Sequence, residues 1–173
     1  MTQSNFLFLG DSLIADFDWQ ARMQHFKVLN HGIAGETVQG LLNRIPSIGT
    51  KVDNPELILV MTGTNNLIIE DYSFLEPLRE ITIQLTSQYP TAEVIINSLL
   101  PCQLPWVPLN VLQQINQSIE DMTQQTGSCY LDMFSKLKPT TDFFQDDGIH
   151  LTPMAYDLWS KSILEFVAFL IED

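Results

Sequence analysis

The sequence predicts one three-layer α/β/α domain, in which a parallel sheet of five strands lies between two layers of helices. Two observations predict this fold class. Apolar runs of strand length, several of them rich in Val and Ile, recur at 6–9, 27–30, 57–61, 94–97 and 129–131. Segments with helical periodicity lie between these runs and after the last one. This alternation is typical of a parallel sheet with right-handed crossovers, covered by helices on both faces.

The helical segments are identified by apolar residues that recur on one face. One face before the fourth run holds Phe74, Leu78, Ile81 and Leu85, and one before the fifth holds Val111, Leu112, Ile115, Ile119 and Met122. The clearest helix is the last, with Thr152 as N-cap and Pro153 at the first helical position. Its apolar stripe consists of Ala155, Leu158, Trp159, Ile163, Phe166, Val167 and Leu170.

Composition narrows the class of protein further. A chain of 173 residues, with 45% hydrophobic and 17% charged residues, is expected to fold as a single globular domain over 1–173. Its 21 acidic residues outnumber its 8 basic residues, for a formal charge of -13. Because nucleic acid and anionic lipid would be repelled, we expect neither as a partner, whereas a neutral or cationic small molecule suits this charge.

The N-terminal residues and the cysteines bear on location. The first apolar run has no basic flank and is short, so we expect no signal peptide and no stable membrane insertion. Cys102 and Cys129 lie among apolar residues and are expected to be free, buried thiols. Together these features predict a cytoplasmic protein.

Polar and glycine-rich segments follow the strand-length runs, where parallel α/β sheets place their ligand sites. They are Gly10-Asp11-Ser12-Leu13, His31-Gly32-Ile33-Ala34-Gly35, Thr62-Gly63-Thr64-Asn65-Asn66 and, before the last helix, Asp147-Gly148-Ile149-His150. A serine hydroxyl needs a base and an orienting group to act as a nucleophile. We predict Ser12 as nucleophile and His150 as base, with Asp147, three residues before it, as the orienting acid. Asp146 and Asp132 are the alternatives for that acid.

Acyl transfer also needs donors for the oxyanion that forms at the carbonyl oxygen. Gly35 can expose its backbone amide because it has no side chain, and Asn65 can direct its side-chain amide to the same point. The amide of Ser12 is the third expected donor.

The four segments, in this order and over nearly the whole chain, resemble the blocks of the GDSL or SGNH hydrolases. The resemblance implies a flavodoxin-like fold, Ser12 as nucleophile, Asp147 and His150 as its triad partners, and Gly35 and Asn65 in the oxyanion hole. Many members have Asp where this chain has Asn66. Gly63-Thr64-Asn65-Asn66, Leu99-Leu100-Pro101 and His150-Leu151-Thr152 are similar to the platelet-activating factor acetylhydrolase branch, which implies short acyl esters as substrates and a homodimer.

Several further residues are candidates for substrate binding. Asp11 and Asn66 belong to the first and third blocks, although Asp11 can instead hold backbone amides and Asn66 can instead fix the Asn65 loop. Trp106, Phe143 and Phe144 are apolar residues outside regular periodicity, and they line a substrate pocket or cover the core. Phe17 and Trp19 have the same two interpretations, and His31 is interpreted as structural.

These observations predict a two-step serine esterase that acts on a small ester and needs no cofactor; no metal-ligand spacing is present. A thioesterase or lysophospholipase for longer acyl chains is the alternative, since a triad does not depend on chain length. A catalytically silent flavodoxin-like binding domain is the alternative from another class. The G-x-S-x-G signature of α/β-hydrolases is absent.

Overall fold

A computed structural model of the protein describes residues 3–172. Its centre is a five-stranded sheet with the order β2-β1-β3-β4-β5, in which every neighbouring pair is parallel. The strands are β1 (Ser4–Gly10), β2 (Phe26–Gly32), β3 (Leu57–Met61), β4 (Glu93–Asn97) and β5 (Cys129–Leu131). The order reverses at β1, so the chain winds outward in both directions from β1 and β3.

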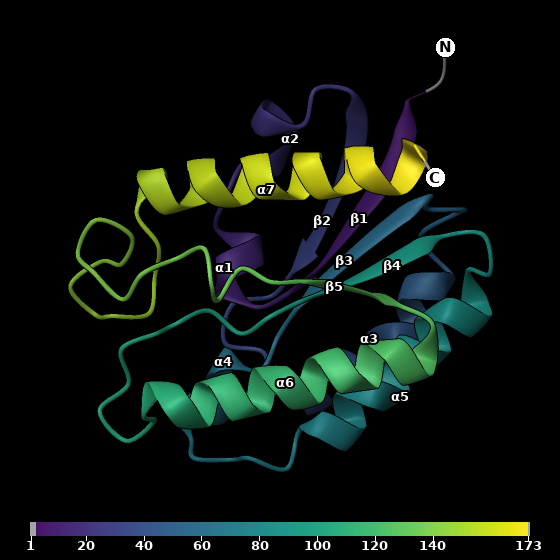
Figure 1. Ribbon diagram of the computed structural model, residues 1–173. Helices are drawn as coiled ribbons and strands as arrows, with labels where there is room; N and C mark the ends of the chain where they lie inside the picture. Colours follow the sequence, from purple (N-terminus) through teal and green to yellow (C-terminus); the bar gives the residue numbers. More distant parts are fainter. Residues whose placement is uncertain (1–2, 173) are drawn as a thin grey trace.

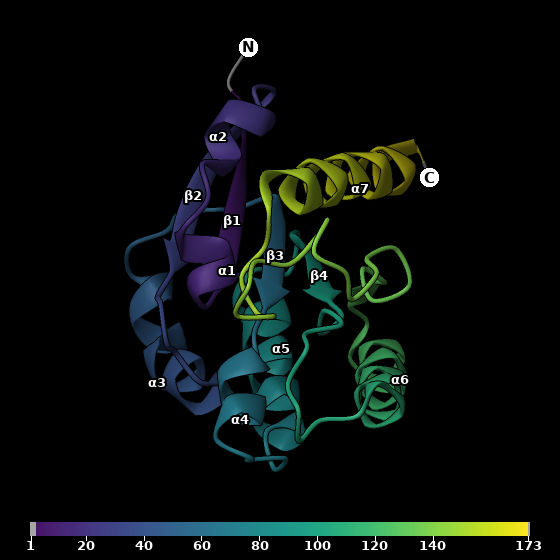
Figure 2. The same ribbon diagram turned by 90° about the vertical axis from the view of Figure 1, so that its left-hand side faces the viewer.

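Helices cover both faces of this sheet (Figure 1). One layer contains α1 (Ser12–Ala15), α2 (Trp19–Arg22) and α7 (Pro153–Glu172). The opposite layer contains α3 (Val38–Gly49), α5 (Leu75–Gln88) and α6 (Leu109–Thr126), and the short α4 (Thr64–Ile68) follows β3. A view turned by 90° shows α7 on the far side of the sheet from α5 and α6 (Figure 2). The expected three-layer α/β/α architecture is confirmed.

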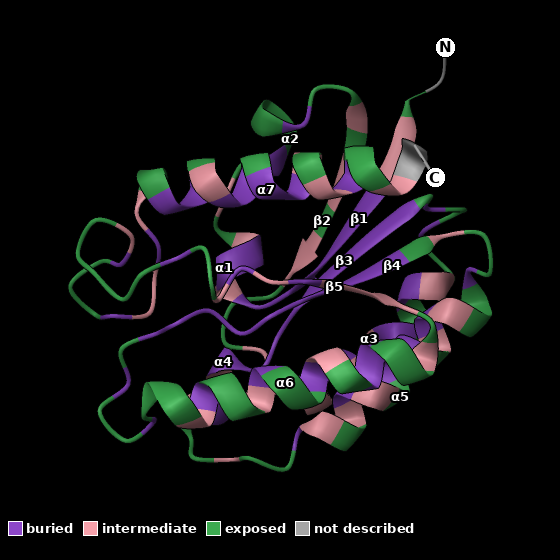
Figure 3. Ribbon diagram, viewed as in Figure 1, coloured by how far each residue is buried: buried purple, intermediate pink, exposed green. Residues whose placement is uncertain are grey.

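The core runs along the central strands and the helix faces that meet them (Figure 3). All five residues of β3 are buried, whereas the edge strand β2 is only partly buried. Phe17 and Trp19 lie in an aromatic cluster against α7, where the Phe17 ring stacks on Tyr156 at 4.1 Å and Trp19 meets Trp159 edge-on at 5.0 Å. Trp19, with 1% exposure, therefore belongs to the core and lines no substrate pocket.

All five predicted strands are present, as are the predicted helices α5, α6 and α7. Thr152 caps α7, because its hydroxyl accepts a hydrogen bond from the amide of Ala155 at 3.3 Å. The sequence analysis missed α3, although Val38, Leu41, Ile45 and Ile48 are its buried stripe. The Thr37 hydroxyl caps this helix by accepting from the Gly40 amide. The helical pattern is hard to recognise in the sequence because Pro46 lies inside the helix, and proline normally ends a helix.

The carboxyl ends of the strands gather at one end of the sheet, together with α1, α4 and the long loop that leads into α7 (Figure 1). Every segment singled out as a candidate site therefore lies at this end. No helix in the described part of the chain combines the length and the apolar character needed to cross a bilayer.

Candidate active site

Ser12 lies in the tight turn between β1 and α1. Gly10 ends β1 so close to β3 that a Cβ atom there would meet the Met61 carbonyl oxygen at 2.1 Å. The Asp11 carboxylate then caps α1 by accepting a hydrogen bond from the Leu13 amide at 3.0 Å. The Tyr156 hydroxyl on α7 donates to the Leu13 carbonyl at 2.9 Å. The sheet, the cap and α7 thus fix the backbone that carries the Ser12 hydroxyl.

The structure brings Ser12, His150 and Asp147 into one hydrogen-bonded chain. The Ser12 Oγ lies 3.2 Å from Nε2 of His150, and Nδ1 of the same ring lies 2.5 Å from Oδ2 of Asp147. The Ser12 and His150 side chains are separated by 138 residues in sequence. With its Nδ1 hydrogen directed to Asp147, the imidazole presents an acceptor at Nε2, which is the arrangement a general base for a serine requires.

Asp147 is held as a carboxylate. Burial would raise its pKa, but the hydrogen bond with His150 and those from the backbone amides of Ile149 and His150 outweigh burial and lower the pKa to about 2. Both amides donate to Oδ1 at 2.9 Å, which leaves Oδ2 for the imidazole. A single carboxylate therefore shapes the turn and orients the His150 imidazole.

Gly148 makes the turn between Asp147 and His150. Its φ of +68° is strained for other residues, and a Cβ atom there would lie 2.8 Å from that of Gln103. The Gln103 amide donates to the Gly148 carbonyl at 2.8 Å, which ties the turn to the segment after β4. The Gln145 amide donates to the His150 carbonyl, and the Gln145 side chain donates to the Leu151 carbonyl, both at 2.8 Å.

The two alternative acids do not reach the imidazole. Asp132 follows β5 and binds the amide and hydroxyl of Ser135, three residues later. Among residues 3–172, Asp147 is the carboxylate that forms a hydrogen bond with the His150 ring. The geometry therefore favours Asp147 over Asp132 and Asp146.

Gly35 follows β2 and Asn65 follows β3, and a hydrogen bond brings the two segments together. The Asn65 Nδ2 donates to the carbonyl of Glu36, the residue after Gly35, at 3.0 Å, and the second hydrogen of that amide remains available. Gly35 has a φ of +78°, is exposed, and has open space where a Cβ would lie. Within the described residues, the Gly35 amide has no backbone acceptor. Both groups are thus able to donate to an oxyanion.

The sequence analysis missed a partly buried ion pair that holds this turn. Arg44 on α3 binds Glu36 through Nε and Nη2, at 2.6 and 2.7 Å, and Nη2 also donates to the His31 carbonyl at 2.7 Å. The side chains of Arg44 and Glu36 are only 18% and 9% exposed. The eight-residue separation gives no signal unless α3 is known, so the pair could not be found from the sequence.

Asp11 is almost completely enclosed. It is 1% exposed, and its Oδ2 has no hydrogen-bond partner among the described residues. Burial raises the pKa of Asp11 to about 6, although the Leu13 amide and the positive charge of His150 act in the opposite direction. The expectation that Asp11 contacts substrate is not supported by this burial, whereas its structural role, capping α1, is present.

The assignment of Asn66 to substrate binding is wrong. Asn66 is 0% exposed, and all its polar atoms are engaged within the protein. Its Oδ1 accepts from the Val38 amide at 2.9 Å, and its Nδ2 donates to Gln39 and Asp71, both at 2.8 Å. Asn66 therefore joins α4, which contains Asn65, to the start of α3. This is the structural role expected as the alternative, in which Asn66 fixes the Asn65 loop.

The three apolar candidates for substrate binding differ in how far they are buried. Phe144 is 1% exposed and pairs with Leu151 in an isolated antiparallel bridge, so it closes the segment that contains Asp147 and His150 and does not offer a substrate surface. Phe143 is partly buried against the core. Trp106 is 44% exposed, and its indole donates to the Leu67 carbonyl at 2.9 Å. Substrate contacts by Trp106 and Phe143 stay predictions.

Comparison with known proteins identifies the family and the fold. The model of the GDSL-like Lipase/Acylhydrolase family matches residues 8–158. An isoamyl acetate-hydrolyzing esterase from Schizosaccharomyces pombe is 24% identical over 79% of this chain and 60% of its own length. The platelet-activating factor acetylhydrolase IB subunit alpha2 of Homo sapiens is 25% identical over 96% of this chain and 77% of its own length. A solved psychrotrophic esterase from Pseudoalteromonas shares the fold, with a TM-score of 0.81, 16% identity, and coverage of 99% of this chain and 100% of the other.

The fold and the family match define the class, a carboxylic ester hydrolase with a doubly wound parallel sheet. More particularly, the chain belongs to the GDSL-like lipase/acylhydrolase family. It spans about three fifths of the length of the Schizosaccharomyces relative and about three quarters of that of the acetylhydrolase subunit.

Proposed function

We propose that this protein is a serine esterase that hydrolyses short-acyl esters, acetyl esters in particular, through an acyl-enzyme on Ser12. The observation that carries the proposal is the continuous chain from the Ser12 hydroxyl through His150 to the Asp147 carboxylate, with contacts of 3.2 and 2.5 Å. The names of two relatives, an acetate-hydrolyzing esterase and an acetylhydrolase subunit, support the preference for acetyl groups.

The first half-reaction forms the acyl-enzyme. His150 Nε2 takes the hydroxyl proton as Ser12 Oγ bonds to the ester carbonyl carbon, and Asp147 stabilises the imidazolium that results. The negative carbonyl oxygen accepts hydrogen bonds from the amides of Ser12 and Gly35 and from Asn65. His150 then gives its proton to the alcohol oxygen as the carbon–oxygen bond breaks, which releases the alcohol.

The second half-reaction regenerates the enzyme. A water molecule transfers one proton to His150 Nε2 and bonds to the acyl carbon, through a second oxyanion held by the same three donors. The bond to Ser12 Oγ breaks, the proton returns to that oxygen, and the carboxylic acid leaves. Each proton passes through the same imidazole, so Asp147 is required in both halves.

Longer acyl chains are a second candidate class, because an apolar cavity lies beside the catalytic loop. It measures about 250 Å³, and its lining includes Leu104, Val107, Leu109 and Gln103, the residue whose amide binds Gly148. A thioesterase or lysophospholipase would place its chain in such a cavity.

A series of p-nitrophenyl esters from acetate to palmitate, hydrolysed by wild type and by Ser12→Ala, tests the proposal. We expect the highest kcat/KM with acetate or butyrate and no Ser12-independent turnover. An optimum at long chains, reduced by Leu109→Trp and retained in Leu109→Ala, would instead favour the second class. Absence of Ser12-dependent turnover on every ester would contradict both and favour a silent binding domain.

A further inference from the structure

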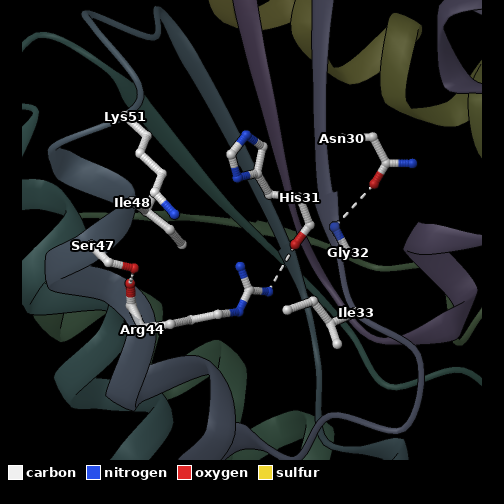
Figure 4. Close-up of a pocket in the computed structure, with 8 residues that line it drawn as sticks. All are labelled: Asn30, His31, Gly32, Ile33, Arg44, Ser47, Ile48 and Lys51. Atoms are coloured by element: carbon white, nitrogen blue, oxygen red, sulfur yellow. Dashed lines mark hydrogen bonds between the residues drawn. The ribbon is translucent and has the colours of Figure 1, made fainter.

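A second cavity lies between the edge strand β2 and helix α3, on residues that the hydrolytic mechanism does not use. It measures about 240 Å³, and its walls include the β2 residue His31, the α3 residues Arg44 and Ser47, and Lys51 just beyond the helix. The close-up shows the His31 ring, the Lys51 ammonium and the Arg44 guanidinium facing a common space (Figure 4). Two of the chain's eight basic residues and one of its three histidines thus gather in a protein with a net charge of -13.

Arg44 directs one N–H group of its guanidinium into this cavity. Its Nε and Nη2 bind Glu36, and Nη2 also binds the His31 carbonyl. In the described residues, the hydrogen bonds of the guanidinium involve Nε and Nη2 only, and Nη1 faces the same space as Lys51 (Figure 4). Glu36 therefore compensates the charge of Arg44 without occupying the donor directed into the cavity.

Lys51 supplies a charge that no other group compensates. Within residues 3–172, no carboxylate forms an ion pair with its ammonium. The pKa of the His31 imidazole is lowered, mainly by burial and further by the positive charges of Arg44 and Lys51. The cavity thus combines an ammonium, a guanidinium N–H and an imidazole, a donor set suited to an oxyanion.

We propose that this cavity is a binding site for a small oxyanion, such as phosphate, sulfate or a carboxylate, held by Lys51, Arg44 Nη1 and the His31 ring. The site is open on one side and only Lys51 carries an uncompensated charge, so we expect weak binding, with a dissociation constant of about 1 mM. The anion is either a free ion or an anionic group of the ester substrate, and the chemistry of recognition is the same for both.

Occupancy is tested by following the His31 ring by NMR while sodium phosphate replaces sodium chloride at constant ionic strength. We expect saturable shifts and a raised His31 pKa, because a bound anion stabilises the imidazolium. Lys51→Gln should weaken binding about tenfold, since it removes one charge-assisted hydrogen bond. Lys138→Gln, a surface lysine outside the cavity with the same charge change, should leave binding unchanged.

Equal phosphate affinity in Lys51→Gln and Lys138→Gln, or shifts that never saturate, would overturn the proposal. Neither readout depends on ester hydrolysis, so the result stands apart from the proposed activity. Kinetics with p-nitrophenyl acetate and with the p-nitrophenyl monoester of succinate then separate the two sources. If the substrate's own anionic group binds here, Lys51→Gln raises KM for the succinyl ester alone, and phosphate competes with that ester. If a free ion binds, KM is unchanged for both esters.

Discussion

The two halves of the active site are built in different ways. The Ser12 turn lies directly between β1 and α1 and is fixed by buried groups, including Asp11 at 1% exposure and the Tyr156 hydroxyl from α7. The loop that carries Asp147 and His150 contains no helix or long strand, and the side chains of these residues are 46% and 41% exposed. Ser12, the proposed nucleophile, is therefore positioned by the core, whereas His150, the proposed base, is positioned by local hydrogen bonds.

The carboxylates of the two halves illustrate this difference. Asp11 has a pKa raised to about 6, since burial dominates, and one of its oxygens lacks a partner. Asp147 has a pKa lowered to about 2, because its hydrogen bonds to His150 and to two amides exceed the effect of burial. An acid that must stabilise an imidazolium has to remain ionised, so exposure combined with specific hydrogen bonds suits Asp147 and not Asp11.

Asp147→Asn should give the largest effect among changes that keep the nucleophile. We expect kcat to fall by about ten-thousand-fold, as for the same change in a serine protease, because an amide favours the wrong imidazole tautomer. The measurement is steady-state hydrolysis of p-nitrophenyl acetate. Asp146→Asn is the matched control, being the neighbouring exposed carboxylate, and should keep near wild-type turnover. Equal losses in the two variants would contradict the assignment of Asp147.

Asn65→Ala should lower kcat by about a hundredfold to a thousandfold, the usual effect of removing one oxyanion donor. KM should change little, because the interaction strengthens only as the oxyanion forms. Asn43→Ala, an exposed asparagine on α3, controls for the loss of an amide. A rise in KM with kcat unchanged would assign Asn65 to substrate binding instead.

Gly148→Ala tests how far the base loop depends on its own turn. The positive φ and the approach to Gln103 should together cost about 1–3 kcal/mol of stability and lower kcat about tenfold. Gly127→Ala separates the two causes, since Gly127 has a φ of +69° but open space around its Cβ position. Thermal unfolding and kcat are measured for both. A kcat equal to that of wild type in Gly148→Ala would show that the loop tolerates distortion.

Asp11→Asn should have the smallest effect on turnover, within a few-fold, and a distinct effect on the pH dependence of stability. The folded state binds the Asp11 proton more tightly than the unfolded state, since its pKa is raised from 3.8 to about 6. The free energy of unfolding should therefore fall as the pH rises from about 4 to 6, by at most about 3 kcal/mol. The variant should lose this slope in urea titrations.

Asp18→Asn is the control for Asp11→Asn. Asp18 also caps a helix, by accepting from the Ala21 amide at 3.1 Å, but it is exposed. Its replacement should leave the slope between pH 4 and 6 intact. A slope that persists in Asp11→Asn would show that another group carries it.

The sequence predicted the strands and the common location of the polar segments well, because both depend on local patterns. Continuous apolar runs fixed the five strands, and the position of the polar segments after them placed Ser12, Asn65 and His150 at one end of the sheet. The misassignment of Asn66 had a physical cause, since an asparagine that caps a distant helix looks the same in sequence as one that faces substrate. The ion pair of Arg44 with Glu36 could not be predicted, because Pro46 prevented the recognition of α3, the helix that carries Arg44. The homodimer and the cytoplasmic location stay predictions.

The most direct test of the central claim is covalent labelling with an alkyl phosphonate ester, followed by peptide mass spectrometry. The arrangement of Ser12, His150 and Asp147 predicts one adduct per chain on Ser12, loss of esterase activity in proportion to labelling, and no adduct in Ser12→Ala. Labelling should be much slower in Asp147→Asn, since the serine then lacks an oriented base. An adduct on another residue, or hydrolysis that continues when Ser12 is fully labelled, would contradict the claim.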